Sequence, residues 1–221
     1  VLPDAVEFTD FTKKLLHYWW REGRHPRLFF CQLEAAETII FLNEIRLGGK
    51  RTRFKPAFTD AYLEELQDIP ADPALSPLAR LGIKMATGSG KTVVMGMLIA
   101  WAFCNRAKVP SDTRFPSAAL VVCPNLTIKE RLQVLRPENA GNYYDAFDLV
   151  PSKLRPLLQG GKVLVTNWHL FAPESEHSEG GRSYKVVDKG PEGPQAFARR
   201  VLQDLYDRGP IMVFNDEGHH A

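Results

Sequence analysis

Residues 84–92 have the sequence Lys-Met-Ala-Thr-Gly-Ser-Gly-Lys-Thr, and this stretch decides the fold. The short run Leu81–Met85 at its start predicts a buried strand, and the apolar run Val93–Phe103 behind it predicts a helix. A glycine-rich turn between a strand and a helix directs backbone N–H groups and the positive end of the helix toward one point, which suits a polyphosphate. The stretch therefore predicts a phosphate-binding loop (P-loop) in an α/β domain.

The residue types of the loop fit that chemistry. Lys91 is expected to reach the β- and γ-phosphates of ATP, and the Thr92 hydroxyl is expected to bind Mg²⁺. Gly88 and Gly90 keep side chains away from the phosphates and permit the dihedral angles of the turn. The expected nucleotide-binding residues of the loop are Thr87, Gly88, Ser89, Gly90, Lys91 and Thr92. A flexible glycine turn that carries a chance Lys-Thr pair is the alternative.

Composition sets broad limits on the class of protein. The length of 221 residues allows one large domain, or one domain with an appendage. A hydrophobic content of 44% with 24% charged residues is ordinary for a globular protein with a sizeable core. The net charge of +2 is too small to indicate nucleic-acid binding by itself, so any basic surface must be local.

The cysteines and the longest apolar run bear on the compartment. Cys31, Cys104 and Cys123 are odd in number, widely spaced and set in apolar runs, so we expect reduced core residues rather than disulfides or a zinc site. The longest apolar run, Val93–Phe103, is about half a membrane span. No signal peptide is recognisable, and we expect a cytoplasmic protein without a membrane partner.

Three short runs after the P-loop helix predict further strands, at residues 118–123, 163–166 and 211–214. None of them alternates between apolar and polar residues, so each is expected to be buried on both faces of a parallel sheet. Helical stretches are expected at 126–135 and 194–208. Strands that alternate with helices predict a doubly wound parallel sheet flanked by helices.

The part of the chain before the P-loop is predicted to be helical. Residues 10–20 and 32–46 have helical character, and in the second range apolar residues repeat at near-helical spacing. Thr59 or Asp60 is expected to cap a short helix that ends at Asp68. A proline-containing loop then leads to the P-loop.

These patterns give a domain organisation. We divide the chain into an N-terminal helical segment, residues 1–80, and an α/β domain, residues 81–221, with a polar surface insertion at about 173–194. The chain starts at Val1 without a methionine and stops at Ala221 directly after a charged motif, so we expect a fragment of a longer protein.

Two adjacent carboxylates, Asp216 and Glu217, follow the last predicted strand. Doubly wound sheets bind ligands at the carboxyl ends of their strands. A P-loop ATPase needs one acid for the Mg²⁺ shell and usually another to orient or deprotonate the attacking water. Asp216 fits the first role and Glu217 the second, whereas an ordinary solvated loop is the alternative.

His219 and His220 follow the acidic pair. Adjacent side chains on a regular element point in different directions, and no further metal ligands stand nearby in the sequence, which disfavours a metal site. We expect His219 to couple the ATP site to the rest of the protein, with a structural histidine as the alternative.

The P-loop and the Asp-Glu-Gly-His stretch together resemble superfamily two helicases of the Asp-Glu-x-His type. The general P-loop pattern has glycine where this chain has Met85, and those helicases often depart from the pattern at that point. The likeness is greatest to the helicase part of type III restriction enzyme subunits and related DNA motors, and it extends from Gln32 to Ala221. It implies a first RecA-like motor domain, truncated after the second helicase motif.

The resemblance also assigns residues outside the P-loop. Cys31–Ala35 matches the family's glutamine motif, in which Gln32 reads the adenine edge, since a carboxamide both donates and accepts. Leu120–Asn125 and Val165–His169 match strand-end motifs that contact the nucleic-acid backbone. The implied nucleic-acid contacts are Pro124, Asn125, Thr166 and Asn167.

Three side chains near these motifs have open interpretations. Lys129 and Arg131 add positive charge to the implied groove, or belong to a solvated helix face. Trp168 is expected in the core, with stacking on a base as the alternative.

The implied function is an ATP-dependent DNA helicase or translocase of restriction-enzyme type, with ATP and Mg²⁺. Implied partners are DNA, a second RecA-like domain of the same polypeptide that supplies an arginine finger, and restriction or modification subunits. Because that finger is absent from the 221 residues, we expect them to bind ATP but to hydrolyse it poorly. An RNA-remodelling helicase and a nucleotide-binding regulatory module are the alternatives. A small-molecule kinase is disfavoured, because the sequence has no recognisable lid segment.

Overall fold

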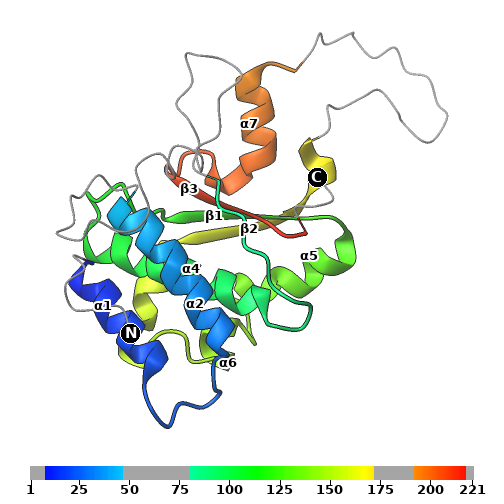
Figure 1. Ribbon diagram of the computed structural model, residues 1–221. Helices are drawn as coiled ribbons and strands as arrows, with labels where there is room; N and C mark the ends of the chain where they lie inside the picture. The colour runs from blue at the N-terminus through cyan, green and yellow to red at the C-terminus, as the bar shows by residue number, and fades with distance from the viewer. Residues whose placement is uncertain (1–7, 47–79, 172–191, 218–221) are drawn as a thin grey trace, which may run out of the picture. The chain divides into compact units, whose positions relative to one another are not determined.

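A computed structural model describes residues 8–46, 80–171 and 192–217 (Figure 1). The chain divides into two compact units, Val1–Leu98 and Ile99–Ala221. The described residues contain no helix that is long and apolar enough to cross a membrane. The division of the sequence at residues 80 and 81 stays a prediction.

The first unit begins with two helices, α1 (Asp10–Trp20) and α2 (Phe30–Phe41), and α2 continues into a π-helical turn, η1 (Leu42–Arg46). These bounds confirm the helices predicted at 10–20 and 32–46. Helix α1 presents one apolar face at helical spacing, as expected for a helix that packs on a core. The buried apolar residues of that face are Phe11, Leu15, Leu16 and Trp19.

A polar contact joins the start of α1 to the end of the α2–η1 segment. The Thr9 hydroxyl accepts a hydrogen bond from the Thr12 backbone N–H at 3.1 Å and so caps α1. The Thr12 hydroxyl donates to the buried Glu44 carboxylate at 2.7 Å. Burial of this carboxylate is tolerated because it is hydrogen-bonded.

Helix α4 (Lys91–Lys108) follows the P-loop, as predicted, and extends past the predicted end at Phe103. The predicted strand Leu81–Met85 is wrong: no residue from Arg80 to Gly90 is in a strand, and Ile83 is 42% exposed. A strand needs a hydrogen-bonded neighbour for its backbone, and none of the three described strands pairs with this run.

The second unit contains a three-stranded parallel sheet in the order β2-β1-β3. The strands are β1 (Ala118–Cys123), β2 (Lys162–Asn167) and β3 (Ile211–Asn215), in close agreement with the predicted runs. In the register, Cys123 pairs with Asn167 and Val122 pairs with Asn215. The carboxyl ends of all three strands therefore lie along one edge.

Burial varies across the sheet. All six residues of the central strand β1 are buried, as predicted. The same prediction is wrong for β3, where Val213 is 60% exposed and no residue is fully buried, because the described elements leave both faces of this strand partly uncovered.

Helices cover the sheet of the second unit (Figure 1). The sequence forms α5 (Leu126–Leu132) after β1, and α7 (Pro194–Leu202) with the short helix η5 (Gln203–Leu205) before β3, in agreement with the helices predicted at 126–135 and 194–208. One core cluster consists of Ala118, Leu120, Val122 and Leu205, with Leu164, Leu202 and Ile211 packed against it.

Shorter helices complete the second unit: η2 (Gln133–Leu135), α6 (Tyr143–Ala146), η3 (Ser152–Gly160) and η4 (Trp168–Phe171). The predicted helix that ends at Asp68, the proline-containing loop after it and most of the 173–194 insertion lie outside the described residues.

The cysteines are free, and two of the three are buried as predicted. Burial raises the pKa of Cys104 to about 12. The prediction is wrong for Cys31, which is exposed on the first turn of α2, because its apolar neighbours Phe29 and Phe30 are themselves exposed.

Candidate nucleotide site and strand-end site

The P-loop has the backbone conformation that its glycines permit. Gly88 and Gly90 have φ values of +79° and +82°, in the left-handed region where a side chain is strained. Between them, the Ser89 backbone N–H donates to the Ala86 carbonyl at 3.2 Å, and the Ser89 hydroxyl donates to the same oxygen at 2.6 Å. The loop is thus a closed turn held by its own hydrogen bonds.

Helix α4 begins directly after the glycine turn. The Gly90 carbonyl accepts hydrogen bonds from the Val93 and Val94 N–H groups at 2.9 and 3.3 Å. The helix therefore begins at Lys91, and the positive end of its dipole lies at the glycine turn. Lys91 and Thr92 are half-buried on this first turn. Such a turn fits the phosphates of a nucleotide.

Gln32 contacts the P-loop directly. Its side chain is only 3% exposed, and its Nε2 donates to the Ser89 carbonyl at 2.9 Å. Its Oε1 accepts from the Phe29 backbone N–H at 2.9 Å, which fixes the amide across the first turn of α2. A Cβ atom at Gly90 would lie 2.2 Å from Gln32 Nε2. The glutamine and the loop are therefore packed without spare room.

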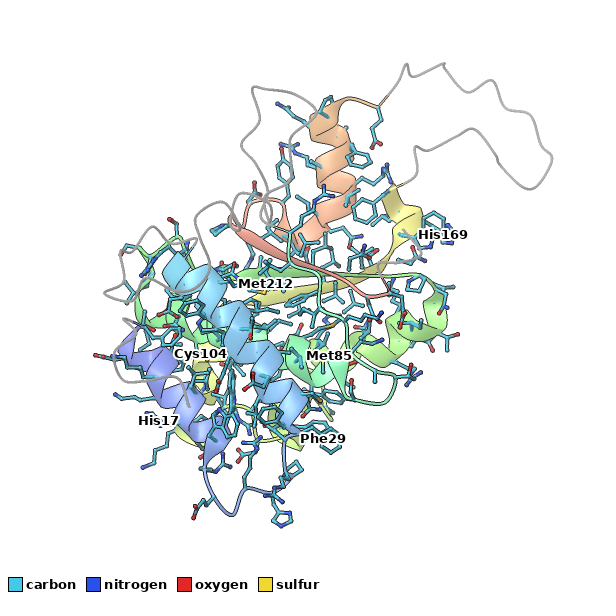
Figure 2. The ribbon with its side chains drawn as sticks, in the orientation of Figure 1. His17, Phe29, Met85, Cys104, His169 and Met212 are labelled. Carbon is cyan, nitrogen blue, oxygen red and sulfur yellow. The ribbon has the colours of Figure 1, made fainter. Side chains whose placement is uncertain are left out.

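A pocket of about 740 Å³ lies at the start of α2, in the same unit. Aromatic and cationic side chains line it together, and Trp20 and Phe30 meet edge to face with centroids 6.3 Å apart. Phe29, directly before α2 (Figure 2), is 58% exposed. The lining of the pocket includes Trp20, Arg24, Arg27, Phe29, Phe30 and Leu33. The sequence analysis missed this pocket, although arginines interleaved with aromatic residues at 19–30 were a usable signal.

The acidic pair lies at the end of β3 in the second unit. The Asp216 backbone N–H donates to the Val122 carbonyl at 2.8 Å, which extends the β1–β3 pairing by one residue. Glu217 has a φ of +57°, a left-handed conformation that is uncommon for a residue with a side chain. Such strain is concentrated at functional sites in proteins.

The Cys123 thiol connects the carboxyl ends of β1 and β2. Its Sγ donates to the Thr166 carbonyl at 3.2 Å and lies 3.5 Å from the Asn125 carbonyl. Burial raises the pKa of Cys123, and the negative charge of Asp216 raises it further. The thiol is therefore protonated and available as a hydrogen-bond donor. Its electrostatic interaction with the Asp216 carboxylate indicates that this carboxylate lies at the same edge of the sheet.

The predicted nucleic-acid contacts occupy this edge. The Asn125 side-chain oxygen accepts from the Ile128 N–H at 2.9 Å and caps α5, so its exposed amide NH₂ points away from that bond. Thr166 is 4% exposed, which leaves little of its side chain at the surface, whereas Asn167 is half-buried. The Pro124 carbonyl accepts a hydrogen bond from the Trp168 indole at 3.0 Å.

The expectation of a core position for Trp168 is wrong. The residue is 52% exposed on η4, the short helix after β2. Strand β2 ends at Asn167, so the indole lies beyond the sheet edge and outside the core.

The predicted site residues fall in both units. Gln32 and the P-loop belong to the first unit, and the residues from Pro124 to Glu217 belong to the second. The structure brings together Gln32 with Ser89, and the ends of β1, β2 and β3. His219 lies outside the described residues.

Comparison with known proteins identifies a protein family. No curated protein and no solved structure matches the chain. The family described as Type III restriction enzyme, res subunit, matches residues 31–221, a range that includes Gln32, the P-loop and the acidic pair. The chain therefore belongs to the family of type III restriction enzyme res subunits, and it is a helicase-like ATP-binding domain with a P-loop α/β fold.

Proposed function

We propose that this chain is the ATP-binding motor domain of an ATP-dependent DNA helicase or translocase of restriction-enzyme type. The observation that carries the proposal is the P-loop turn, in which two left-handed glycines lead into α4 at Lys91 and Gln32 donates to Ser89. The family match supports ATP-dependent helicase-like chemistry in general.

In this proposal the first turn of α4 holds the nucleotide phosphates. The Lys91 ammonium neutralises charge on the β- and γ-phosphates, and the Thr92 hydroxyl and the Asp216 carboxylate hold the Mg²⁺ shell. The bound Mg²⁺ would neutralise the charge that develops on the phosphates as the terminal phosphoryl group leaves. Support comes from the start of α4 at Lys91 and from the charge of Asp216 at the sheet edge.

The edge of the nucleotide base is assigned to Gln32, and its ring to the adjoining pocket at the start of α2. That pocket is lined by Phe29, Phe30 and Leu33, on either side of Gln32 in the sequence, but not by Gln32 itself. In the structure the amide uses Oε1 on Phe29 and one Nε2–H on Ser89, so a purine edge would bind through the second N–H and the second lone pair. Because the side chain is 3% exposed, the base would have to displace part of the residues that cover it. Arginine and aromatic side chains of the pocket suit a stacked base. Because the same Gln32 amide donates to the P-loop backbone at Ser89, binding of the base at Gln32 would affect the conformation of the P-loop.

Hydrolysis is assigned to Glu217, which orients the attacking water and takes its proton. The left-handed backbone of Glu217 supports a functional role, since such strain is concentrated at functional sites. A second RecA-like domain of the same polypeptide would supply an arginine to the leaving phosphate, and His219 would couple the two.

The path of the DNA strand is assigned to the carboxyl edge of the sheet. Pro124, Asn125, Thr166 and Asn167 would contact the sugar-phosphate backbone, with Thr166 acting through its main chain because its side chain is buried. The exposed Asn125 amide supports this assignment.

Restriction or modification subunits are further proposed partners.

The experiment is ATP hydrolysis by the full-length protein with single-stranded DNA, duplex DNA and RNA in parallel. Stimulation by either DNA, and its loss in a Lys91→Ala variant, is the expected result. Stimulation by RNA alone would replace the DNA motor with an RNA-remodelling enzyme. Hydrolysis that no nucleic acid changes would support a nucleotide-binding regulatory module instead.

A further inference from the structure

The turn after β2 presents aromatic side chains at the carboxyl edge of the sheet. Trp168 and Phe171, at the two ends of η4, are 52% and 37% exposed. Trp168 and His169 are stacked, with ring centroids 4.3 Å apart and an angle of 28° between the ring planes. We call this pair the Trp168–His169 platform; His169 lies on the turn beyond β2 (Figure 2).

The indole is held in place from the neighbouring strand end. Its Nε1–H donates to the Pro124 carbonyl at 3.0 Å, a contact between residues 44 positions apart. This bond satisfies the one polar atom of the indole. The exposed remainder of the ring is therefore an apolar surface of fixed orientation.

The other end of the turn is held from α7. The Arg200 Nη1 donates to the Leu170 carbonyl at 2.6 Å. The Glu192 carboxylate fixes that guanidinium with two hydrogen bonds, from Nε at 2.9 Å and from Nη2 at 2.7 Å. The pKa of Glu192 is lowered by these contacts, so the carboxylate stays charged and the brace persists at neutral pH. A platform held from both sides loses little conformational entropy when a ligand binds.

Charges of both signs lie near the end of β1, where Asp216 raises and Lys129 lowers the pKa of Cys123. Lys129 on α5 lies close enough to Cys123 for its charge to lower the pKa of that thiol, which places the ammonium near the end of β1. Arg131 on the same helix is exposed. Flat aromatic surface next to cations is the combination that binds the bases and phosphates of single strands.

We infer that the Trp168–His169 platform stacks against a base of a bound single nucleic-acid strand. This inference rests on the proposed function, because it places the strand on the same sheet edge, and it adds a base contact to the proposed backbone contacts. Stacking uses the face that every base has, so the contact carries no sequence preference. Such a contact suits a protein that moves along a strand.

Binding of a fluorescently labelled oligonucleotide to the full-length protein, followed by fluorescence anisotropy, tests the inference. One arm uses a single-stranded oligonucleotide, as DNA and as RNA, and the other uses an abasic chain of equal length and charge. Wild-type protein is expected to bind the oligonucleotide with bases about five- to 150-fold more tightly than the abasic chain. Trp168→Ala should remove most of this difference, and Trp168→Phe, which keeps a stacking ring, should retain more of it.

Control measurements separate the possible failures. Val109→Ala removes an apolar side chain of similar exposure, 50%, and should bind like the wild type. ATP binding by Trp168→Ala shows that the variant is folded. Equal affinity of the wild-type protein for the oligonucleotide with bases and for the abasic chain would contradict base stacking on the platform, without contradicting the proposed motor function. This comparison needs no variant. Absence of wild-type binding to either chain overturns the nucleic-acid part of the proposed function, and the platform with it.

Discussion

Gln32 Nε2 donates a 2.9 Å hydrogen bond to the Ser89 carbonyl, between residues 57 positions apart in the chain. The contact joins the first turn of α2 to the phosphate-binding loop, and it leaves no space for a side chain at Gly90. The orientation of the Gln32 amide, which we propose reads the base, and the conformation of the loop therefore depend on the same contact.

A double-mutant cycle tests this packing. Gly90→Ala adds a Cβ that would lie 2.2 Å from Gln32 Nε2, in addition to the strain of a side chain at a φ of +82°. Gln32→Ala removes the colliding atom, so the two losses in ATP affinity should not add, with a coupling of about 0.5–3 kcal/mol. Gly88→Ala is the control, since its φ is +79° and a Cβ at that position would have nothing within 4 Å. Additive losses with Gly90→Ala would contradict the contact.

Base selectivity gives a second prediction. If the Gln32 amide reads the purine edge, Gln32→Ala weakens ATP binding by about 1–2 kcal/mol and narrows the preference for ATP over GTP. Titration calorimetry with both nucleotides measures the ratio. An unchanged ATP/GTP ratio would remove Gln32 from the base site and leave it a purely structural contact of the P-loop.

A third prediction concerns Glu217, the residue that we propose activates the attacking water. In the full-length protein, Glu217→Gln keeps the side-chain size but removes the base, so steady-state hydrolysis should fall by roughly a hundredfold or more while ATP binding is retained. Glu138→Gln, which weakens surface ion pairs with Arg136 and Lys162, should hydrolyse ATP at the parental rate. Parental turnover by Glu217→Gln would assign the proton transfer to another group.

The sequence correctly predicts the helices and strands whose own residue pattern is enough to determine their structure. The apolar runs that form β1 and most of α4 are buried along nearly their whole length, and their observed bounds lie close to the predicted ones. The run Leu81–Met85 does not form the predicted strand, because a strand also depends on a neighbour that the sequence does not identify.

The candidate site shows the same limit. The glycine pattern predicts the P-loop turn, since left-handed φ values at Gly88 and Gly90 follow from the residue type. Spacing in the sequence does not reveal that Gln32 donates to Ser89, nor that Trp168 is anchored outside the core, because both contacts are made by the tertiary fold.

The packing of Gly161 provides a fourth prediction, on stability. A Cβ atom at Gly161 would lie 2.0 Å from Phe103 Cδ2, and Phe103 is a core residue that is only 2% exposed. Gly161→Ala should therefore destabilise the fold by about 1–3 kcal/mol. Gly160→Ala is a matched control, since nothing lies within 4 Å of a Cβ there. Equal melting temperatures for the two variants in thermal denaturation would show that Phe103 does not pack on this glycine.

Titration calorimetry of ATP–Mg²⁺ binding to the full-length protein tests the central claim most directly. Lys91 and Lys108 are the first and last residues of the same helix, α4, so Lys91→Ala and Lys108→Ala remove equal charge at opposite ends. The P-loop assignment predicts that Lys91→Ala abolishes measurable ATP binding and that Lys108→Ala binds ATP like the parent. Parental affinity in Lys91→Ala would show that the nucleotide site lies elsewhere.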